Sequence, residues 1–255
     1  MSKEHFWPDW LSAYISKGKD DKHFSEVHTS NAKRPAVLEK KIERSGNLIT
    51  KKFRVVCKEC NNGWMSKLEE KTKPLILALM ESSSKSLSED EIHLLSRWVF
   101  MKVAVAEQSE DGTQVTPSED MRFFYKYEKI PEYFRIYIAH QNTEYESVYH
   151  RHAATLAFSK DGPSPPLNGM KRNTQSVSFI VGALFVYVTA ARLDDFDLES
   201  YFSLQKLRRI FPVEMGVLDL DELEVLEKSD ITEAIWSLGD LTSSAGVNYV
   251  KSLPK

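Results

Sequence analysis

The sequence predicts an α+β fold, in which a small N-terminal module at residues 1–81 precedes a larger α+β domain with a mainly antiparallel sheet at residues 82–255. Three observations predict this class. Apolar residues recur with helical spacing at residues 62–80 and from Ser88 to about Glu107, and runs rich in β-branched and aromatic residues follow beyond Gln108. The third observation is a serine-rich, charged stretch at residues 82–91, which is typical of a hinge or a domain boundary.

The first expected elements are short. Residues 2–8 predict a strand that Pro8 limits, because proline has no backbone N–H to donate to a neighbouring strand. Residues 9–15 predict an amphipathic helix with Asp9 as its N-cap. Residues 16–30 are polar and predict a loop.

A hairpin and a helix are expected next. Residues 42–57 predict a hairpin with its turn at Gly46-Asn47. Residues 62–80 have helical spacing, and Pro74 is expected to bend or break this helix into two pieces.

The larger domain begins with the clearest helix signal in the chain. Ser88 and Glu91 have the spacing of a capping box, which predicts a helix that runs to about Glu107. The elements expected beyond it are strands at residues 134–140, 147–159 and 176–190, a loop at residues 163–166, and helices at residues 198–210 and 231–238.

Composition narrows the class of protein. The chain has no apolar run approaching the ~20 residues that cross a bilayer, and its start lacks the apolar segment of a secretory signal. The two cysteines lie three positions apart, which favours a reducing cytoplasm over a disulfide scaffold. We therefore expect a cytoplasmic protein without a membrane segment.

Two short segments carry residues suited to chemistry, Glu4-His5 and Cys57-x-x-Cys60-Asn61. An imidazole, with an ordinary pKa of roughly 6.5, suits a general base near neutral pH. Carboxylate and amide oxygens suit a hard divalent cation such as Mg²⁺. Together these residues are the set expected of a one-metal nuclease site.

Both segments also resemble one known family. Residues 2–11, with the pattern EHxxPxWL, resemble the opening of HNH-like proteins from bacteria and phages. Residues 55–69, with the pattern CxxCNxGWMxxLE, resemble the second block of the same family. The resemblance implies a ββα-metal module, in which a β-hairpin and one helix hold a single divalent cation.

The resemblance also implies a role for each residue. His5 would be the catalytic base that activates water, while Glu4 and Asn61 would hold one Mg²⁺ or Mn²⁺ ion that polarises the phosphate. The implied activity is cleavage of phosphodiester bonds in nucleic acid, with DNA favoured over RNA.

Cys57 and Cys60 have a separate implied role as metal ligands. In related ββα-metal proteins such a pair is half of a structural zinc site, completed by a second Cys-x-x-Cys upstream of the Glu-His. This chain has only two cysteines, so four cysteine ligands cannot be assembled and structural zinc is in doubt. His23 or His28 could complete the site, the thiols could stay reduced, or the coding sequence could start further upstream.

Charge is divided unevenly along the chain. Residues 1–80 contain 16 Lys/Arg and 10 Asp/Glu, a net charge of +6, whereas the remaining residues contain 18 and 27, a net charge of −9. Nine basic residues between and beside the motif halves are predicted to contact phosphates: Lys33, Arg34, Lys40, Lys41, Arg44, Lys51, Lys52, Arg54 and Lys58. A solvated loop is the alternative for this run. The acidic C-terminal region could bind a protein partner.

Each motif has a simpler alternative. Glu4-His5 could be a solvated pair, the cysteines could be a redox pair, and Asn61 could cap a helix. His140, His150 and His152 form a weaker candidate for a second metal cluster. The alternative function is a catalytically inactive ββα scaffold that binds nucleic acid or protein, which the missing cysteine pair favours.

Overall fold

The structure is a computed structural model that describes residues 2–5, 7–14, 22–31, 34–45, 52–108, 112–143, 147–156, 171–193, 198–202, 204–214 and 216–242. For residues 2–5, 22–31, 34–45, 52–55, 147, 201 and 242 it describes the backbone alone. The expected loop at residues 163–166 lies outside these ranges.

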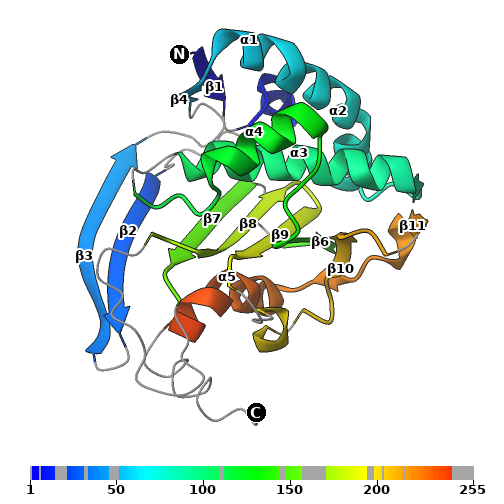
Figure 1. Ribbon diagram of the computed structural model, residues 1–255. Helices are drawn as coiled ribbons and strands as arrows, with labels where there is room; N and C mark the ends of the chain where they lie inside the picture. Colours follow the sequence, from blue (N-terminus) through cyan, green and yellow to red (C-terminus); the bar gives the residue numbers. More distant parts are fainter. Residues whose placement is uncertain are drawn as a thin grey trace.

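The centre of the molecule is a mixed sheet whose strands are mainly antiparallel (Figure 1). Its strand order is β10 (Arg208–Phe211), β6 (Phe134–Gln141), β9 (Leu184–Ala191), β8 (Thr174–Val181) and β7 (Ser147–Ala154). These neighbours are all antiparallel, while the two-residue β12 (Val225–Leu226) adds a parallel pair to β6. The expected α+β class with a mainly antiparallel sheet is confirmed.

A tight turn at Gly182 separates β8 from β9. Gly182 has a φ of +57°, and a Cβ atom there would lie 3.1 Å from the backbone oxygen of Met80. The same Met80 oxygen accepts a hydrogen bond from the N–H of Ala183, so the turn is held against the end of a helix. The single strand predicted at residues 176–190 is therefore wrong, because the chain reverses at this glycine.

Helices cover both faces of the sheet (Figure 1). One face packs against α3 (Glu89–Glu107), with α2 (Ser66–Met80) and α4 (Ser118–Tyr127) beside it. The other face packs against α5 (Lys228–Thr242). Every buried strand therefore has an apolar partner layer above and below, which explains why their residues are buried almost without interruption.

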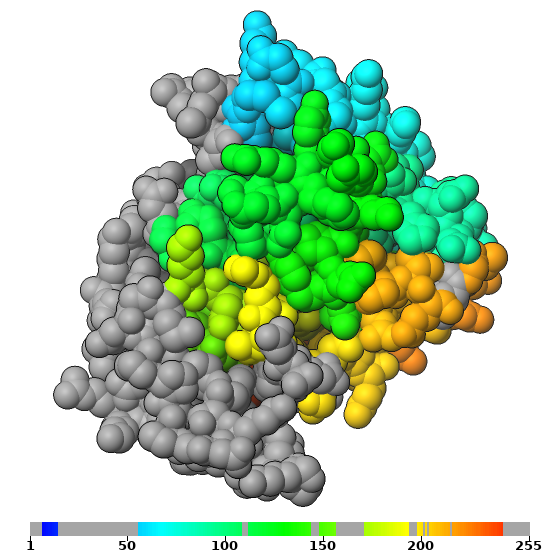
Figure 2. Space-filling model, viewed as in Figure 1, coloured from blue at the N-terminus to red at the C-terminus, as the bar shows by residue number. Residues whose placement is uncertain are grey.

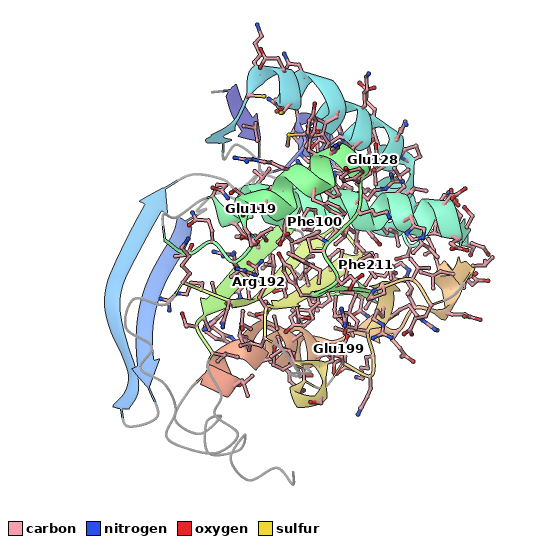
Figure 3. The ribbon with its side chains drawn as sticks, viewed as in Figure 1. Phe100, Glu119, Glu128, Arg192, Glu199 and Phe211 are labelled. Carbon is pink, nitrogen blue, oxygen red and sulfur yellow. The ribbon has the colours of Figure 1, made fainter. Side chains whose placement is uncertain are left out.

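The helix α3 begins where its capping box predicts. The Ser88 hydroxyl accepts from the N–H of Glu91 at 3.3 Å, and the Glu91 carboxylate accepts from the N–H of Ser88 at 2.9 Å. From Trp98 onward the helix is buried on all sides. Phe100 shows why: its ring lies 4.5 Å from that of Phe124 on α4 and 4.9 Å from that of Phe134 on β6 (Figure 3).

The N-terminal strands pair differently from the prediction. β1 (Ser2–His5) pairs with β4 (Lys52–Val56), and β2 (Lys22–Asn31) pairs with β3 (Arg34–Ser45). The predicted loop at residues 16–30 and the predicted hairpin at residues 42–57 are therefore wrong in these described parts. The β2–β3 hairpin forms a long arm at the side of the molecule in Figure 1.

Three further expectations need correction. Pro74 lies inside an uninterrupted α2, and both Pro74 and Glu70 are exposed, so the Glu70 carbonyl that loses its helical donor is in an exposed turn. The helix predicted at residues 198–210 is a short η4 (Leu198–Tyr201) followed by β10. The helix α4 was not expected, because the first element predicted after Gln108 was the strand at residues 134–140.

The remaining elements are short. They are η1 (Asp9–Ala13), α1 (Lys58–Cys60), η3 (Asn61–Met65), β5 (Ser86–Ser88), β11 (Val217–Asp219) and η5 (Leu220–Glu222). The predicted helix at residues 231–238 is confirmed as part of α5. No helix within the described ranges combines the length and apolar character needed to span a bilayer.

One apolar cluster crosses the predicted boundary between residues 81 and 82. It contains Trp7 and Leu11 from the N-terminal part, Leu79 from α2, and Trp98 and Phe179 from the larger part. The division into two domains remains a prediction, but the side chains on either side of it pack together.

Candidate functional site

Backbone pairing brings the two motif halves together. In the antiparallel β1–β4 pair, Ser2 is opposite Val56, Glu4 opposite Phe53 and His5 opposite Lys52. Val56 is the last residue of β4, and Cys57 follows it directly. The strand that carries Glu4 and His5 therefore neighbours the strand that leads into the cysteine and asparagine motif, although the motif halves lie about fifty residues apart in the sequence.

The helix after β4 begins at Cys57. Cys57 has extended backbone angles and is the N-cap of α1, and its Sγ accepts a hydrogen bond from the N–H of Cys60 at 3.1 Å. The helix was expected to start at Asn62, with Asn61 or Asn62 as a possible cap. The structure corrects this: the cap is four residues earlier, so Asn61 is not the N-cap.

Asn61 opens a π-helical turn that changes the direction of the chain. Its N–H donates to the carbonyl of Cys57 at 3.0 Å, and Gly63 in the same turn has the non-helical angles φ −104° and ψ −106°. The kink that was expected at Pro74 is thus at Gly63. π-Helical turns of this kind often occur at functional sites.

Buried residues that flank His5 and Asn61 pack into the same core. Trp7, two residues after His5, is fully buried, and Met65, four residues after Asn61, is 2% exposed. Both belong to one apolar cluster, against which Cys60 also packs. Farther along, the Lys73 ammonium of α2 lies 5.2 Å from the Trp10 ring centre. These contacts hold η1 against α2 and support the backbone pairing of β1 with β4.

The two thiols influence each other. Cys57 is exposed and Cys60 is half-buried, and the two form no disulfide. The pKa of Cys60 is raised, chiefly by its side-chain hydrogen bond with Cys57 and then by burial. Cys60 is therefore held as a neutral thiol, and a cation that binds this pair would have to displace its proton.

The predicted metal ligands stay predictions. The backbones of Glu4 and His5 are described, but their side chains lie outside the described part, as do those of His23 and His28 on β2. Among the side chains that are described, no group of three or more His, Cys, Asp or Glu residues could hold a metal ion. Cys57 and Cys60 are two neighbouring thiols within that part of the chain, and their role as metal ligands remains a prediction.

The predicted basic residues divide into two groups. Arg34, Lys40, Lys41 and Arg44 lie on β3 in the arm, where Lys41 is opposite Glu26 and Arg44 opposite His23. The second group is Lys52 and Arg54 on β4 and the exposed Lys58 on α1. Lys33 and Lys51 lie outside the described residues. Contact of all nine basic residues with phosphates remains a prediction.

The three histidines of the second candidate metal cluster do not come together. His140 is on β6, whereas His150 and His152 are on β7, and two strands separate β6 from β7. The His150 ring packs at 5.2 Å from the Trp236 ring of α5. The His152 ring lies beside Gly239 of the same helix, 3.4 Å from where a Cβ atom would be. His150 and His152 share one face of β7, as their spacing suggested, and that face meets a helix.

Two carboxylates, one half-buried and one fully buried, escaped the sequence analysis. Glu69, the last residue of the second motif, forms an ion pair with Lys102, whose side chain is 1% exposed. Glu107, at the end of α3, is fully buried and accepts from the N–H groups of Val115 and Thr116 at 2.9 and 2.8 Å. The place of Glu69 in the family pattern was a sequence signal that could have identified it. No local sequence pattern distinguishes Glu107.

Comparison with known proteins adds no assignment. No family model, no curated protein and no solved structure matches the chain. The fold and the residues described above are therefore the whole basis for a functional proposal.

Proposed function

We propose that this chain is a metal-dependent nuclease of the HNH type, built on an N-terminal ββα-metal module. The observation that carries the proposal is the pairing of β1 with β4. β4 leads directly into α1, so the Glu4-His5 strand pairs with the strand that precedes the helix, and a strand pair with one helix is what the motif resemblance implies.

Each residue has a role that its chemistry suits. His5 is the base that takes a proton from water, and Glu4 and Asn61 hold one Mg²⁺ or Mn²⁺ ion through oxygen atoms. When bound, the ion supplies charge stabilisation at the phosphate. The kink at Gly63 and the cap at Cys57 fix the turn that carries Asn61.

Nucleic acid, with DNA favoured, is the proposed substrate because basic residues lie on the elements that carry or adjoin the motif. Lys52 and Arg54 lie on the strand paired with β1, and Lys58 is exposed one residue after the cap. The β2–β3 arm adds Arg34, Lys40, Lys41 and Arg44. Phosphate contacts from such residues give salt-dependent affinity without sequence preference.

The test is plasmid cleavage in Mg²⁺ or Mn²⁺ by the wild-type protein and by His5→Ala. We expect cleavage to be lost in the variant while its DNA affinity is kept, because the base acts in the chemical step alone. His93→Ala is the matched control, since His93 is exposed on α3. Equal cleavage by wild type and His5→Ala would exclude His5 as the base.

The presence of only two cysteines favours a second candidate, a catalytically inactive ββα scaffold that binds nucleic acid or protein. The same assay separates the two candidates. A wild-type protein that binds DNA with a normal salt dependence but cleaves nothing in either metal would support the binding scaffold.

A further inference from the structure

Helix α4 carries an unusual outer surface. Phe124 is 4% exposed and anchors the helix to the core, but Phe123, Tyr125 and Tyr127 are 45%, 60% and 50% exposed. The other large apolar side chains exposed among the described residues, such as Tyr14 and Trp236, lie on separate elements. Three exposed aromatic rings therefore lie within five residues of one helix, and such a concentration of exposed apolar surface often marks an interaction site. Figure 2 shows α4 as a raised band on the face in view, next to α1 and α2.

The aromatic rings are arranged in two sets on the flanks of the helix. Phe123 and Tyr127 are one turn apart, with ring centres 4.9 Å apart. Tyr125 lies on the opposite flank, where its ring is 5.9 Å from that of Trp64. Trp64 follows Asn61 by three residues in the π-helical turn, so this flank of α4 adjoins the proposed metal site.

Cations accompany the rings. Arg122 and Lys126 are exposed, no ion pair joins either to another described side chain, and the Lys126 ammonium lies 4.9 Å from the Tyr127 ring centre. Two carboxylates nearby are already engaged, since Glu128 pairs with Arg97 and Asp120 accepts from the Tyr133 hydroxyl at 2.7 Å. Figure 3 labels Glu119 and Glu128, which lie towards the two ends of α4. The middle of the helix therefore presents aromatic rings and two cations that form no ion pair among the described residues, while the exposed Glu119 lies three positions before Arg122.

We propose that this surface, formed by Arg122, Phe123, Tyr125, Lys126 and Tyr127, binds single-stranded nucleic acid. Unpaired bases stack on exposed aromatic rings, and cations between the rings contact the phosphates. A duplex keeps its bases inside and cannot use the rings. The inference rests on the proposed nuclease function, because it assigns an unpaired strand as the substrate presented to the Asn61 site.

The test is binding, measured without cleavage. Fluorescence anisotropy in EDTA would compare the binding of a labelled oligothymidylate with that of a blunt duplex. The oligothymidylate would have about 15 nucleotides, a length in the range of known single-strand sites. We expect Tyr125→Ala to weaken binding of the single strand about tenfold, and Phe123→Ala/Tyr125→Ala/Tyr127→Ala to weaken it on the order of a hundredfold, with the duplex unaffected. Trp236→Ala is the control, because it removes an exposed ring from a distant helix and should change neither affinity.

Charge substitutions supply an independent measurement. Arg122→Gln/Lys126→Gln should lower the slope of log affinity against log salt for the single strand by about 0.7 per lost contact, whereas the aromatic variants should keep the wild-type slope. Thermal unfolding checks that each variant folds. If the triple variant does not fold, the single-residue variants decide the outcome of the test.

The outcomes separate this proposal from the nuclease proposal. Three results would each overturn the α4 proposal, even if plasmid is cleaved. The first is wild-type affinity of the folded aromatic variants for the single strand, and the second is an equal loss of affinity for single strand and duplex. The third is a wild-type protein that does not bind the single strand. A wild type that binds the single strand through α4 but cleaves no nucleic acid would overturn the nuclease proposal alone.

Discussion

The two faces of the central sheet are built from different kinds of side chain. The face under α3 is lined by aliphatic and aromatic residues, such as Ile136, Val177, Phe179, Val186 and Val188. Along each strand, residues that face α5 alternate with residues that face α3, and many of those that face α5 carry hydroxyl groups. Its polar members include Tyr137, Ser176, Ser178, Tyr187 and Thr189.

The difference extends to hydrogen bonding. The hydroxyls of Tyr137 and Ser178 are buried and have no hydrogen-bond partner among the described residues, whereas the Tyr187 hydroxyl bonds to that of Ser237 on α5. Burial raises the pKa of Tyr187, so its hydroxyl stays neutral. Buried hydroxyls lower the net gain from packing, because each loses hydration. The α5 face is therefore expected to contribute less to stability than the α3 face.

The comparison also indicates what each face supports. The α3 cluster includes Trp7 and Met65, which flank the candidate site, so the packing that folds the sheet also positions the motif segments. The α5 face includes none of the residues of the proposed nuclease site among its described members, although it carries His150 and His152 of the second candidate cluster. Damage to the first face should impair the site, and damage to the second should loosen α5 alone.

The largest expected effect comes from a matched pair of phenylalanines on opposite faces. Phe179 faces α3, with ring centres 5.3 Å from Trp7 and 6.1 Å from Trp98, and Phe185 faces α5. We expect Phe179→Ala to lower the free energy of unfolding by about 5 kcal/mol and Phe185→Ala by about 3 kcal/mol, since Phe179 also loses two aromatic pairs. Urea unfolding measures both values. Equal losses, or a larger loss for Phe185→Ala, would break the proposed ranking of the faces.

A smaller effect is expected at the joint between α2 and α3. Lys102 is buried and pairs with Glu69, so Glu69→Ala should remove the carboxylate of this ion pair and cost about 3 kcal/mol. Replacing both partners, as Glu69→Leu/Lys102→Met, should recover most of this loss because the buried charge is removed as well. Urea unfolding of the single and double variants gives the comparison. A double variant as unstable as Glu69→Ala would mean that Glu69 acts through its shape and not through its charge.

Local sequence patterns correctly predicted some of the elements. The Ser88 and Glu91 spacing predicted the start of α3, because both hydrogen bonds of a capping box form within four residues. The antiparallel sheet followed from β-rich runs that each pair with a neighbour. In the candidate site, the family resemblance implied that the Glu4-His5 and cysteine segments meet; β1 pairs with the strand before Cys57, although the hairpin predicted at residues 42–57 does not form.

Other features depend on contacts that a local pattern does not contain. Arg208–Phe211 had helical spacing but extends because it pairs with β6, so tertiary pairing overrides the local preference. The β2–β3 arm and the chain reversal at Gly182 likewise depend on partners across the chain. Cys57 was missed as the N-cap because cysteine is not among the usual capping residues, although its Sγ accepts the same backbone donor.

The smallest expected effect is a pH dependence confined to the α5 face. His150 packs against Trp236 of α5, and burial lowers its pKa below the ordinary value of 6.5. The unfolded chain therefore takes up a proton at higher pH than the folded chain does, so the contribution of neutral His150 is complete above about pH 6.5 and is lost as pH falls through the lowered pKa. We expect the free energy of unfolding to fall less between pH 7.5 and 5 in His150→Gln than in the wild type, with the tryptophan emission of Trp236 changing first. His93→Gln, on the exposed side of α3, is the control for the loss of a histidine that does not face α5. If His150→Gln keeps the wild-type profile, protonation of this ring does not loosen α5, and the polar character of that face would have to act through its hydroxyl groups alone.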